Sequence, residues 1–267
     1  MLKLSEEMFD KLTYYVRANY GINLETKCTL VEGRLSQPAL ARGYRDLDEY
    51  VKAVFDDQTG VEMISVVNRI TTNHTFFMRE PEHFKFLANV IMPYIESSVE
   101  DKDMRIWCAG CSTGQEAYSL AMTINDYFGH RKGGWDTTIL ATDINTEALQ
   151  TAKEAIYPPD ALQGLTEERL DRYFIKLPNG SYRVCDSLRS EVCFKRFNLM
   201  EPIVYKKPFD LISCRNVTIY FDTATKDALI ERFYDCTKKG GYLFIGHAEN
   251  VSRNSRYGYV QPATYRK

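Results

Sequence analysis

Two segments of this sequence carry residues suited to holding an adenosine-containing ligand. Residues 109–116 (AGCSTGQE) form a turn of small residues between a predicted strand and a predicted helix, and such a turn lets backbone amides approach a ligand closely. Asp143 ends the next predicted strand, where its carboxylate can accept hydrogen bonds from both hydroxyls of a ribose. The pattern therefore predicts an adenosine site at the carboxyl edge of a sheet.

The spacing within this site argues against a dinucleotide. The turn lacks the G-x-G-x-x-G pattern, and Asp143 follows Gly110 by 33 residues, whereas a compact dinucleotide fingerprint needs about 20. An adenosine cofactor without a pyrophosphate, S-adenosylmethionine, fits the pattern better. Each feature also has a purely structural alternative. The turn could need glycine only to pass from strand to helix, and Asp143 could cap a helix that starts near Asn145.

A different chemistry, thiol-disulfide exchange, is suggested by Cys108 and Cys111, which follow Trp107 in a W-C-x-x-C arrangement. The rest of the chain does not resemble a single small thioredoxin-type domain, and residues 112–116 have no role in that chemistry, so this stays a minor alternative. We expect no metal, because the sequence has no second C-x-x-C and no paired H-x-x-x-H. Its four histidines are dispersed along the chain: His74, His83, His130 and His247.

The elements that must position these residues alternate between strand and helix from residue 104 onward. This alternation predicts an α/β domain with a parallel, doubly wound sheet. Near the end of the chain, residues 258–267 read as a last strand at an antiparallel edge. The expected strands lie within residues 105–110, 137–144, 208–216 and 240–248, and the expected helices start near residue 113 and span 145–156 and 223–239.

Residues 157–196 interrupt the alternation. Asn179-Gly180, flanked by β-prone residues, predicts a hairpin there. We therefore expect a small inserted antiparallel β subdomain over about residues 157–196.

The N-terminal part of the chain has apolar residues at three- and four-residue spacing, which predicts helices. Ser5 and Asp46 are the expected N-caps, and Gly21 and Gly43 the expected stops. We expect a helical N-terminal domain over residues 1–80, a linker helix and linker over 81–103, and the α/β domain over 104–267. The helical patterns lie at residues 5–22, 29–44, 47–57, 62–73 and 80–95.

Composition excludes several classes of protein. The chain has 34 Lys and Arg against 36 Asp and Glu, a net charge of −2, so a strongly basic nucleic-acid binder is excluded. At 44% hydrophobic and 26% charged residues it is an ordinary globular sequence. It has no apolar run of signal-peptide or membrane-spanning length, and its seven cysteines are an odd number. We therefore expect a cytoplasmic protein with reduced thiols and no membrane insertion.

Five segments carry a family resemblance: residues 72–80 (TNHTFFMRE), 111–119 (CSTGQEAYS), 141–144 (ATDI), 197–199 (FNL) and 214–221 (CRNVTIYF). In this order, over nearly the whole chain, they closely resemble the CheR-type chemotaxis receptor methyltransferases. The resemblance implies a helical N-terminal domain and a class I methyltransferase domain with a small β insertion. It also implies transfer of a methyl group from S-adenosylmethionine to receptor glutamate side chains, giving γ-glutamyl methyl esters and S-adenosylhomocysteine.

The resemblance also implies site residues. Arg79 and Tyr220 are the expected catalytic residues. The sequence departs mildly from the family at Gln115 and Ala117, where the usual run reads Glu-Glu-Pro, and at Thr218, where an aliphatic residue is common. The expected cofactor-binding residues are Asn73, Thr75, Arg79, Gly110, Glu116, Asp143, Asn198, Leu199, Arg215 and Asn216.

The implied partner is the Glu-rich helical region of chemoreceptors, to which a monomeric enzyme would be recruited at membrane-bound arrays. Residues 26–45 carry four cations against Glu32 on a predicted helix, which suits electrostatic docking, although an ordinary solvated helix face is the alternative. The insertion appears shorter than in relatives that grip a receptor tether peptide, so we expect tether independence. A catalytically silent cofactor-binding protein is the main alternative. The docking candidates are Lys27, Arg34, Arg42 and Arg45.

Overall fold

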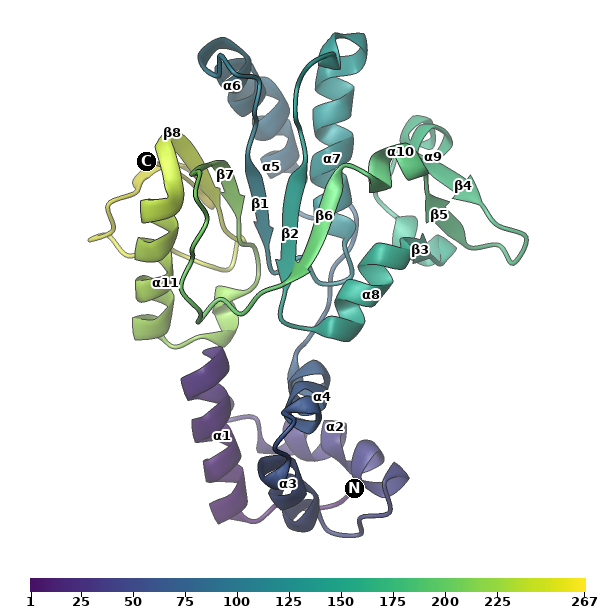
Figure 1. Cartoon of the computed structure of the whole chain (residues 1–267), viewed down its shortest axis with the longest axis vertical. Coiled ribbons are helices and arrows are strands. Elements are labelled where there is room, and N and C mark those ends of the chain that lie inside the picture. The colour runs from purple at the N-terminus through teal and green to yellow at the C-terminus, as the bar shows by residue number, and fades with distance from the viewer.

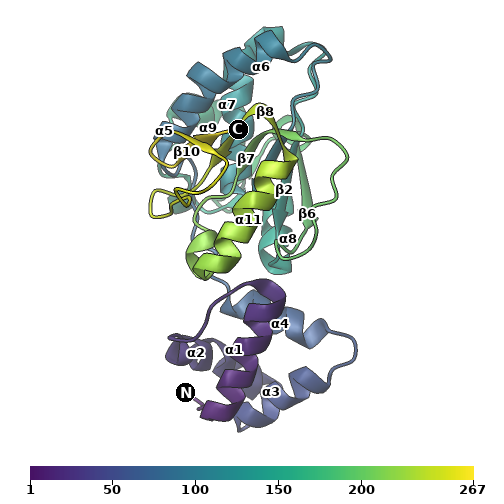
Figure 2. The ribbon, with the colours of Figure 1, turned by 90° about the vertical axis from the view of Figure 1, so that its left-hand side faces the viewer.

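The computed structural model describes residues 1–267, and it has a small helical domain below a larger sheet domain (Figures 1 and 2). The expected caps of the helical domain are confirmed: Ser5 accepts a hydrogen bond from the amide of Met8, and Asp46 accepts from Asp48 and Glu49. Its helices are α1 (Glu6–Tyr20), α2 (Cys28–Ala41), α3 (Leu47–Asp56) and α4 (Val61–Ile70).

The apolar stripes of these four helices form a core of their own. Leu12 and Val16 of α1 meet Leu35 of α2 and Val51 of α3, and all four side chains are fully buried. The helical spacing seen in the sequence therefore corresponds to the faces that pack inward.

Residues 81–103, expected to be a linker helix and linker, do contain a helical stretch, and it packs on the sheet domain. Residues 81–98 form α5 (Pro81–Phe86), a π-helical turn η1 (Leu87–Ile91) and α6 (Met92–Ser98). Phe84, Leu87 and Ile95 are buried in the same apolar cluster as the sheet residue Ile106. This stretch is thus a layer of the sheet domain, because its apolar face has the sheet to cover.

The main sheet has seven strands in the order β6-β2-β1-β7-β8-β10-β9. The pairs from β6 to β8 are parallel, and β10 and β9 are antiparallel additions, which confirms the doubly wound α/β class. The strand order reverses between β1 and β7, so a ligand site is expected beyond their carboxyl ends. The parallel strands are β1 (Ile106–Ala109), β2 (Ile139–Asp143), β6 (Val192–Arg196), β7 (Phe209–Ser213) and β8 (Thr237–Phe244).

Both faces of the sheet are covered. Along β1, Ile106 and Cys108 point into the cluster shared with α7 (Gln115–Phe128), whereas Trp107 and Ala109 point into the cluster shared with α11 (Thr223–Cys236). This alternation is the period of two that a strand requires. The continuous apolar runs of the sequence reflect burial on both faces.

Two details of the sheet differ from expectation. Residues 192–196, assigned to the insertion, form β6 and pair with β2 in the main sheet. The charged side chains of Lys195 and Arg196 are exposed at this edge, which concealed the strand. At the other edge there are two strands instead of one, β9 (Gly258–Gln261) and β10 (Thr264–Arg266).

The insertion itself is a three-stranded antiparallel sheet in the order β3-β5-β4, as its hairpin signal predicted. Gly180 occupies the turn with φ of 84°. Its elements are β3 (Ile156–Tyr157), η3 (Pro159–Leu162), α9 (Glu167–Tyr173), β4 (Phe174–Lys176), β5 (Tyr182–Val184) and α10 (Asp186–Arg189). Two further elements are α8 (Thr146–Glu154), which precedes the insertion, and η2 (Gly129–Lys132), which follows α7.

Two separate contacts join the domains. At the end of α1, Arg17 forms an ion pair of 2.9 Å with Asp222, and Ile22 forms a β-bridge with Phe221. At the end of α4, the backbone oxygen of Asn68 accepts a hydrogen bond from the side chain of Asn145, the residue before α8. In Figure 1 helix α1 lies below α11 and helix α4 lies below α8, so the helical domain faces the carboxyl edge of the sheet.

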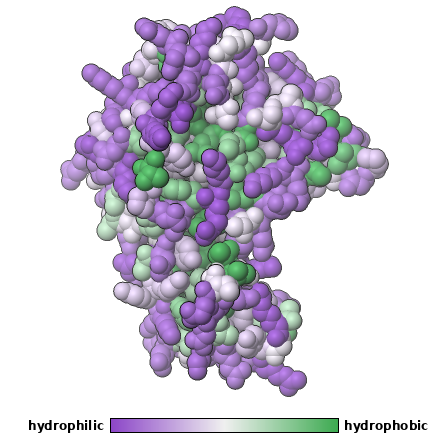
Figure 3. Space-filling view, in the orientation of Figure 1, coloured by the Kyte–Doolittle hydropathy of each residue, from purple (hydrophilic) through white to green (hydrophobic).

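The space-filling view shows a notch between the two lobes, with apolar surface on the sheet domain above it (Figure 3). No helix of the structure combines the length and apolarity that crossing a membrane requires.

Candidate active site

A pocket opens between the domains at the carboxyl ends of β1, β2 and β7. Its floor comes from the turns that follow these strands, and one wall comes from residues 70–75 together with Arg79. The facing wall comes from the helical domain. The pocket brings together every residue that was expected to be catalytic or to bind the cofactor: Asn73, Thr75, Arg79, Gly110, Glu116, Asp143, Asn198, Leu199, Arg215, Asn216 and Tyr220.

The buried guanidinium of Arg215 connects residues from different walls of the pocket. The side chain of Arg215, just after β7, is only 1% exposed. Its Nη1 donates to Oε2 of Glu116 on α7 at 3.1 Å, and its Nη2 lies 3.2 Å from Oε2 of Glu80. The same Nη2 donates to the backbone oxygen of Arg79. Arg215 therefore fixes the segment between the domains to the end of the sheet.

Arg79 is aimed into the pocket by an unusual backbone. Met78 and Glu80, on either side of it, have φ of 57° and 55°, a region that residues other than glycine rarely occupy. The Arg79 guanidinium is partly exposed, and its Nη1 donates to the backbone oxygen of His74 at 2.9 Å. Its other donors remain available to a ligand.

Asp143 lines the pocket and is not the cap of helix α8. Its Oδ2 accepts from the amide of Ser112 at 2.7 Å and its Oδ1 from the amide of Asn145 at 2.8 Å. The N-cap of α8 is Asn145, which accepts from Ala148. Burial raises the pKa of the Asp143 carboxyl, and the amide bonds act in the opposite direction. Each oxygen keeps a lone pair for a further hydrogen bond.

The glycines of the turn after β1 have a structural reason. Gly110 has φ of 91°, and a side chain there would overlap Val217. Gly114 has φ of 96°, and a Cβ there would meet Ala152 of α8. The tight turn from strand to helix thus explains why both positions are glycine. Because Gly110 also lines the pocket, its lack of a side chain lets a ligand come close to the backbone.

The loop after β7 is held by Glu249, which the sequence analysis missed. Its carboxylate accepts hydrogen bonds from the amides of Asn216, Ile219 and Gly246 and from the hydroxyl of Thr218. Asn216 adopts φ of 58° within this loop. In the sequence, this residue is recognisable only as a glutamate that follows the last parallel strand. That position alone does not indicate a role.

Tyr220 lies where this loop meets the helical domain. Its backbone oxygen accepts from the amide of Asn23, and its ring is partly buried against the core of that domain while also lining the pocket. Asn198 also bridges the domains, since its side-chain nitrogen donates to the backbone oxygen of Asn19 at 2.7 Å.

The four docking candidates have different surroundings. Lys27 lines the pocket, and Arg45 is exposed. Arg34 donates to the backbone oxygens of residues 69–71 at the end of α4, and Arg42 forms an ion pair of 2.9 Å with Glu62. Arg34 and Arg42 are thus engaged within the helical domain, and the docking role of all four stays a prediction.

The sequence did not reveal that the helical domain contributes to the pocket. Its contribution is mostly apolar, and apolar residues of a helical domain are indistinguishable in sequence from its core. The residues concerned are Tyr20, Ile22, Asn23, Leu24, Lys27, Leu30 and Ile70.

The two cysteines of the W-C-x-x-C segment are unsuited to thiol chemistry. Cys108 and Cys111 are both buried and free. Burial raises the pKa of each thiol well above its usual range, and the nearby carboxylates of Glu116 and Asp143 act in the same direction. Cys108 belongs to the apolar cluster beneath α7.

The chain matches two family models, one after the other. Residues 7–71 match the model described as CheR methyltransferase, all-alpha domain, and residues 73–266 match CheR methyltransferase, SAM binding domain. A chemotaxis protein methyltransferase of Borreliella burgdorferi is 38% identical, covering 100% of this chain and 96% of its own length. That of Escherichia coli is 36% identical, covering 96% and 88%. That of Pseudomonas putida, Cher2, is 34% identical, covering 91% and 90%.

The burial of the thiols generates a prediction. In the folded protein, Cys108 and Cys111 should be alkylated by iodoacetamide at least about tenfold more slowly than the partly exposed Cys28 and Cys193, because the thiolate is the reactive form. Peptide mass spectrometry after a time course, with a urea-unfolded sample as the control, measures this. Equal rates in the folded protein would restore the redox alternative.

Proposed function

Because the chain belongs to the CheR methyltransferase family, we propose that it transfers a methyl group from S-adenosylmethionine to glutamate carboxylates of chemoreceptors, which yields γ-glutamyl methyl esters and S-adenosylhomocysteine. The observation that carries the proposal is the pocket between the domains, where Asp143, Arg79 and Tyr220 converge at the switch point of the sheet. The alternatives of a silent binder or a thiol enzyme are not favoured.

The residues of the pocket fit S-adenosylmethionine. Asp143 has lone pairs for the two ribose hydroxyls, and Asn198 and Leu199 lie beside it in the pocket wall, where they would flank the adenine. Glu116 offers a negative charge for the amino group of the methionine part. When bound, the cofactor supplies a methyl group activated by a sulfonium charge.

The proposed chemistry needs no general base in this chain. A glutamate with pKa near ~4.3 is ionised at neutral pH, and methyl transfer to its carboxylate moves no proton. The reacting charges are opposite and both disappear in the products, so a pocket that excludes water favours the reaction. The helical domain closes one side of the pocket with apolar residues. Catalysis would then consist mostly of alignment and desolvation.

We assign Arg79 to capture and orientation of the attacking carboxylate. A tight ion pair would stabilise the reactant more than the transition state, because the charge it recognises is fading. The partly exposed guanidinium of Arg79 suits a weaker contact, and it would release the neutral ester easily. Tyr220, which also lines the pocket, would border the reacting methyl group.

The setting of the reaction is also part of the proposal. A chemoreceptor substrate implies action in the cytoplasm at receptor arrays, with the Glu-rich receptor helix approaching Lys27 and Arg45 at the helical domain. The insertion is limited to three short strands, which favours an enzyme that works without a receptor tether. We keep residues 1–80 as the recognition domain and 104–267 as the methyltransferase domain, to which residues 81–98 add a helical layer, with a monomer as the working form.

Methyl transfer to receptors is the direct test. The full chain, incubated with chemoreceptor-containing membranes and methyl-labelled S-adenosylmethionine, should produce label that mild alkali releases as methanol, because methyl esters are base-labile. Membranes without chemoreceptors are the control. Tight S-adenosylhomocysteine binding without any labelled ester would instead identify a silent cofactor-binding protein.

Replacing Asp143 tests the ribose assignment. Asp143→Ala should weaken S-adenosylhomocysteine binding about tenfold or more, since hydrogen bonds to a charged group contribute roughly 1.5–3 kcal/mol. Asp136→Ala is a matched control, because Asp136 holds the amide of Thr138 at the opposite end of β2. Calorimetric titration measures both variants. An unchanged affinity in Asp143→Ala would refute the assignment.

Replacing Arg79 tests its role in alignment. Arg79→Ala should lower the rate of methylation at saturating cofactor by more than it weakens cofactor binding, because the contact orients the substrate carboxylate. Arg131→Ala, in η2 at the far end of the sheet, is the control. Titrations and rates are measured in parallel on the same preparations. A normal rate at saturating substrate would contradict this role.

A further inference from the structure

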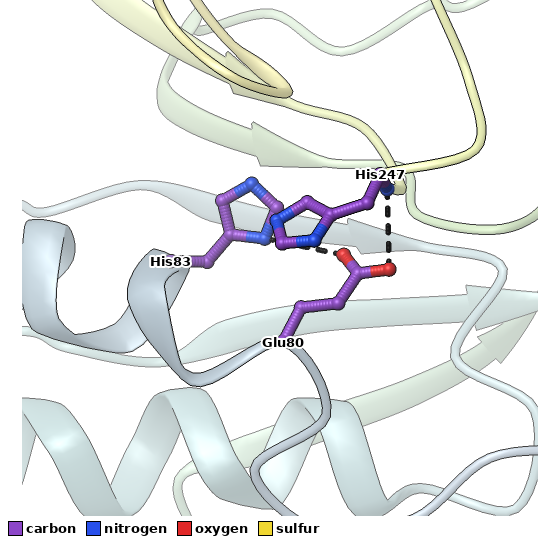
Figure 4. Close-up of side chains that lie close together, drawn as sticks. All are labelled: Glu80, His83 and His247. Atoms are coloured by element: carbon purple, nitrogen blue, oxygen red, sulfur yellow. Dashed lines mark hydrogen bonds and ion pairs between the residues drawn. The ribbon is translucent and has the colours of Figure 1, made fainter.

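Folding brings together three potential metal ligands that are far apart in sequence: Glu80, His83 and His247. Glu80 precedes α5, His83 lies in its first turn, and His247 follows β8. One ligand atom from each lies within 4.8 Å of the other two. Figure 4 shows the imidazoles of His83 and His247 next to each other, with the carboxylate of Glu80 beside them. None of the three was assigned a role from the sequence.

The hydrogen bonds of His83 define which of its nitrogens carries a lone pair. Its Nε2 lies 3.2 Å from the backbone oxygen of Ala263, which can only accept, so Nε2 is the protonated nitrogen. Nδ1 of the neutral ring is then an acceptor. It has no hydrogen-bond partner, although the side chain is only 1% exposed. It faces Oε2 of Glu80 at 3.5 Å, which is also an acceptor.

Two facing acceptors call for a positive group between them. An ion bound there would give the buried Nδ1, which has no hydrogen-bond partner, a contact shared with the Glu80 carboxylate. A neutral imidazole with a free Nδ1 and an Nε2–H held by a backbone oxygen is the form in which histidine binds a metal. The exposed ring of His247 provides a route for an ion from solvent.

The surrounding charges permit a cation. The positive charge of Arg215, whose Nη2 lies 3.2 Å from Oε2 of Glu80, would repel a bound cation. The same guanidinium is already paired with Glu116, which reduces this repulsion. Glu249 adds a third carboxylate, since it accepts from the amide of Gly246 next to His247. Two carboxylates therefore share one buried guanidinium and a third lies beside His247, which leaves an excess of negative charge for a divalent ion to neutralise.

We propose that Glu80, His83 and His247 bind a divalent transition-metal ion of the Zn²⁺ type. Two imidazoles and one carboxylate are a common set of protein ligands for zinc, with a further position open to water. The ion would join the backbone next to Arg79 to the loop after β8, and so would brace the wall of the pocket. It takes no part in the proposed methyl transfer. We expected no metal because the histidines are dispersed along the sequence. Spacing in the sequence does not show which of them meet in the fold.

Metal titration of the full chain without an affinity tag tests the proposal. Calorimetry should detect one equivalent of Zn²⁺, and Co²⁺ should give visible absorption bands of a nitrogen- and oxygen-ligated ion. His247→Ala should weaken Zn²⁺ binding at least about tenfold, because one of three ligands is lost. His130→Ala, which removes an exposed histidine elsewhere, should bind like the parent.

The replaced histidine is exposed, so circular dichroism should show both variants folded like the parent. His83→Gln provides a second ligand variant, and it should also weaken binding. Absence of Zn²⁺ binding by the parent chain would overturn the proposal. So would equal binding by His247→Ala, or Co²⁺ bands of thiolate ligation that persist in that variant.

Discussion

The buried guanidinium of Arg215 is the interaction on which the rest of the site depends. It sits after β7 and binds one carboxylate from α7 and one from the segment between the domains. A buried charge is tolerated only when it is paired, and removing one partner typically costs about 3–5 kcal/mol. Glu80, Glu116 and Arg215 must therefore come together whenever the sheet domain folds, and their meeting point is the wall of the pocket.

This constraint explains how two domains with separate cores form one site. Pairing with Arg215 holds Glu80 in a left-handed conformation, and Arg79 is thereby turned toward the carboxyl ends of the strands. The helical domain, anchored at the ends of α1 and α4, then closes the opposite side. Cofactor and substrate carboxylate would meet in an enclosed space, which suits a reaction between opposite charges.

The sequence predicted the features that depend on local pattern. The helices, their caps at Ser5 and Asp46, the parallel strands and the position of Asp143 follow from periodicity and strand ends. Features that depend on tertiary contacts were missed: the edge strand β6, the docking of α5 and α6 on the sheet, and the roles of Glu80 and Glu249. His83 and His247 meet only because α5 packs beside the end of β8.

A double-mutant cycle between Glu80 and Arg215 measures the central interaction directly. The free energy of unfolding in denaturant, followed through the fluorescence of buried Trp107, would be determined for Glu80→Gln, Arg215→Met, the double variant and the parent. Each single variant should lose roughly 3 kcal/mol or more, and the double variant should lose clearly less than the sum, because the Glu80–Arg215 interaction that either change removes can be lost only once. Additive losses would show that the two residues are not coupled, and that Arg215 does not hold the segment between the domains.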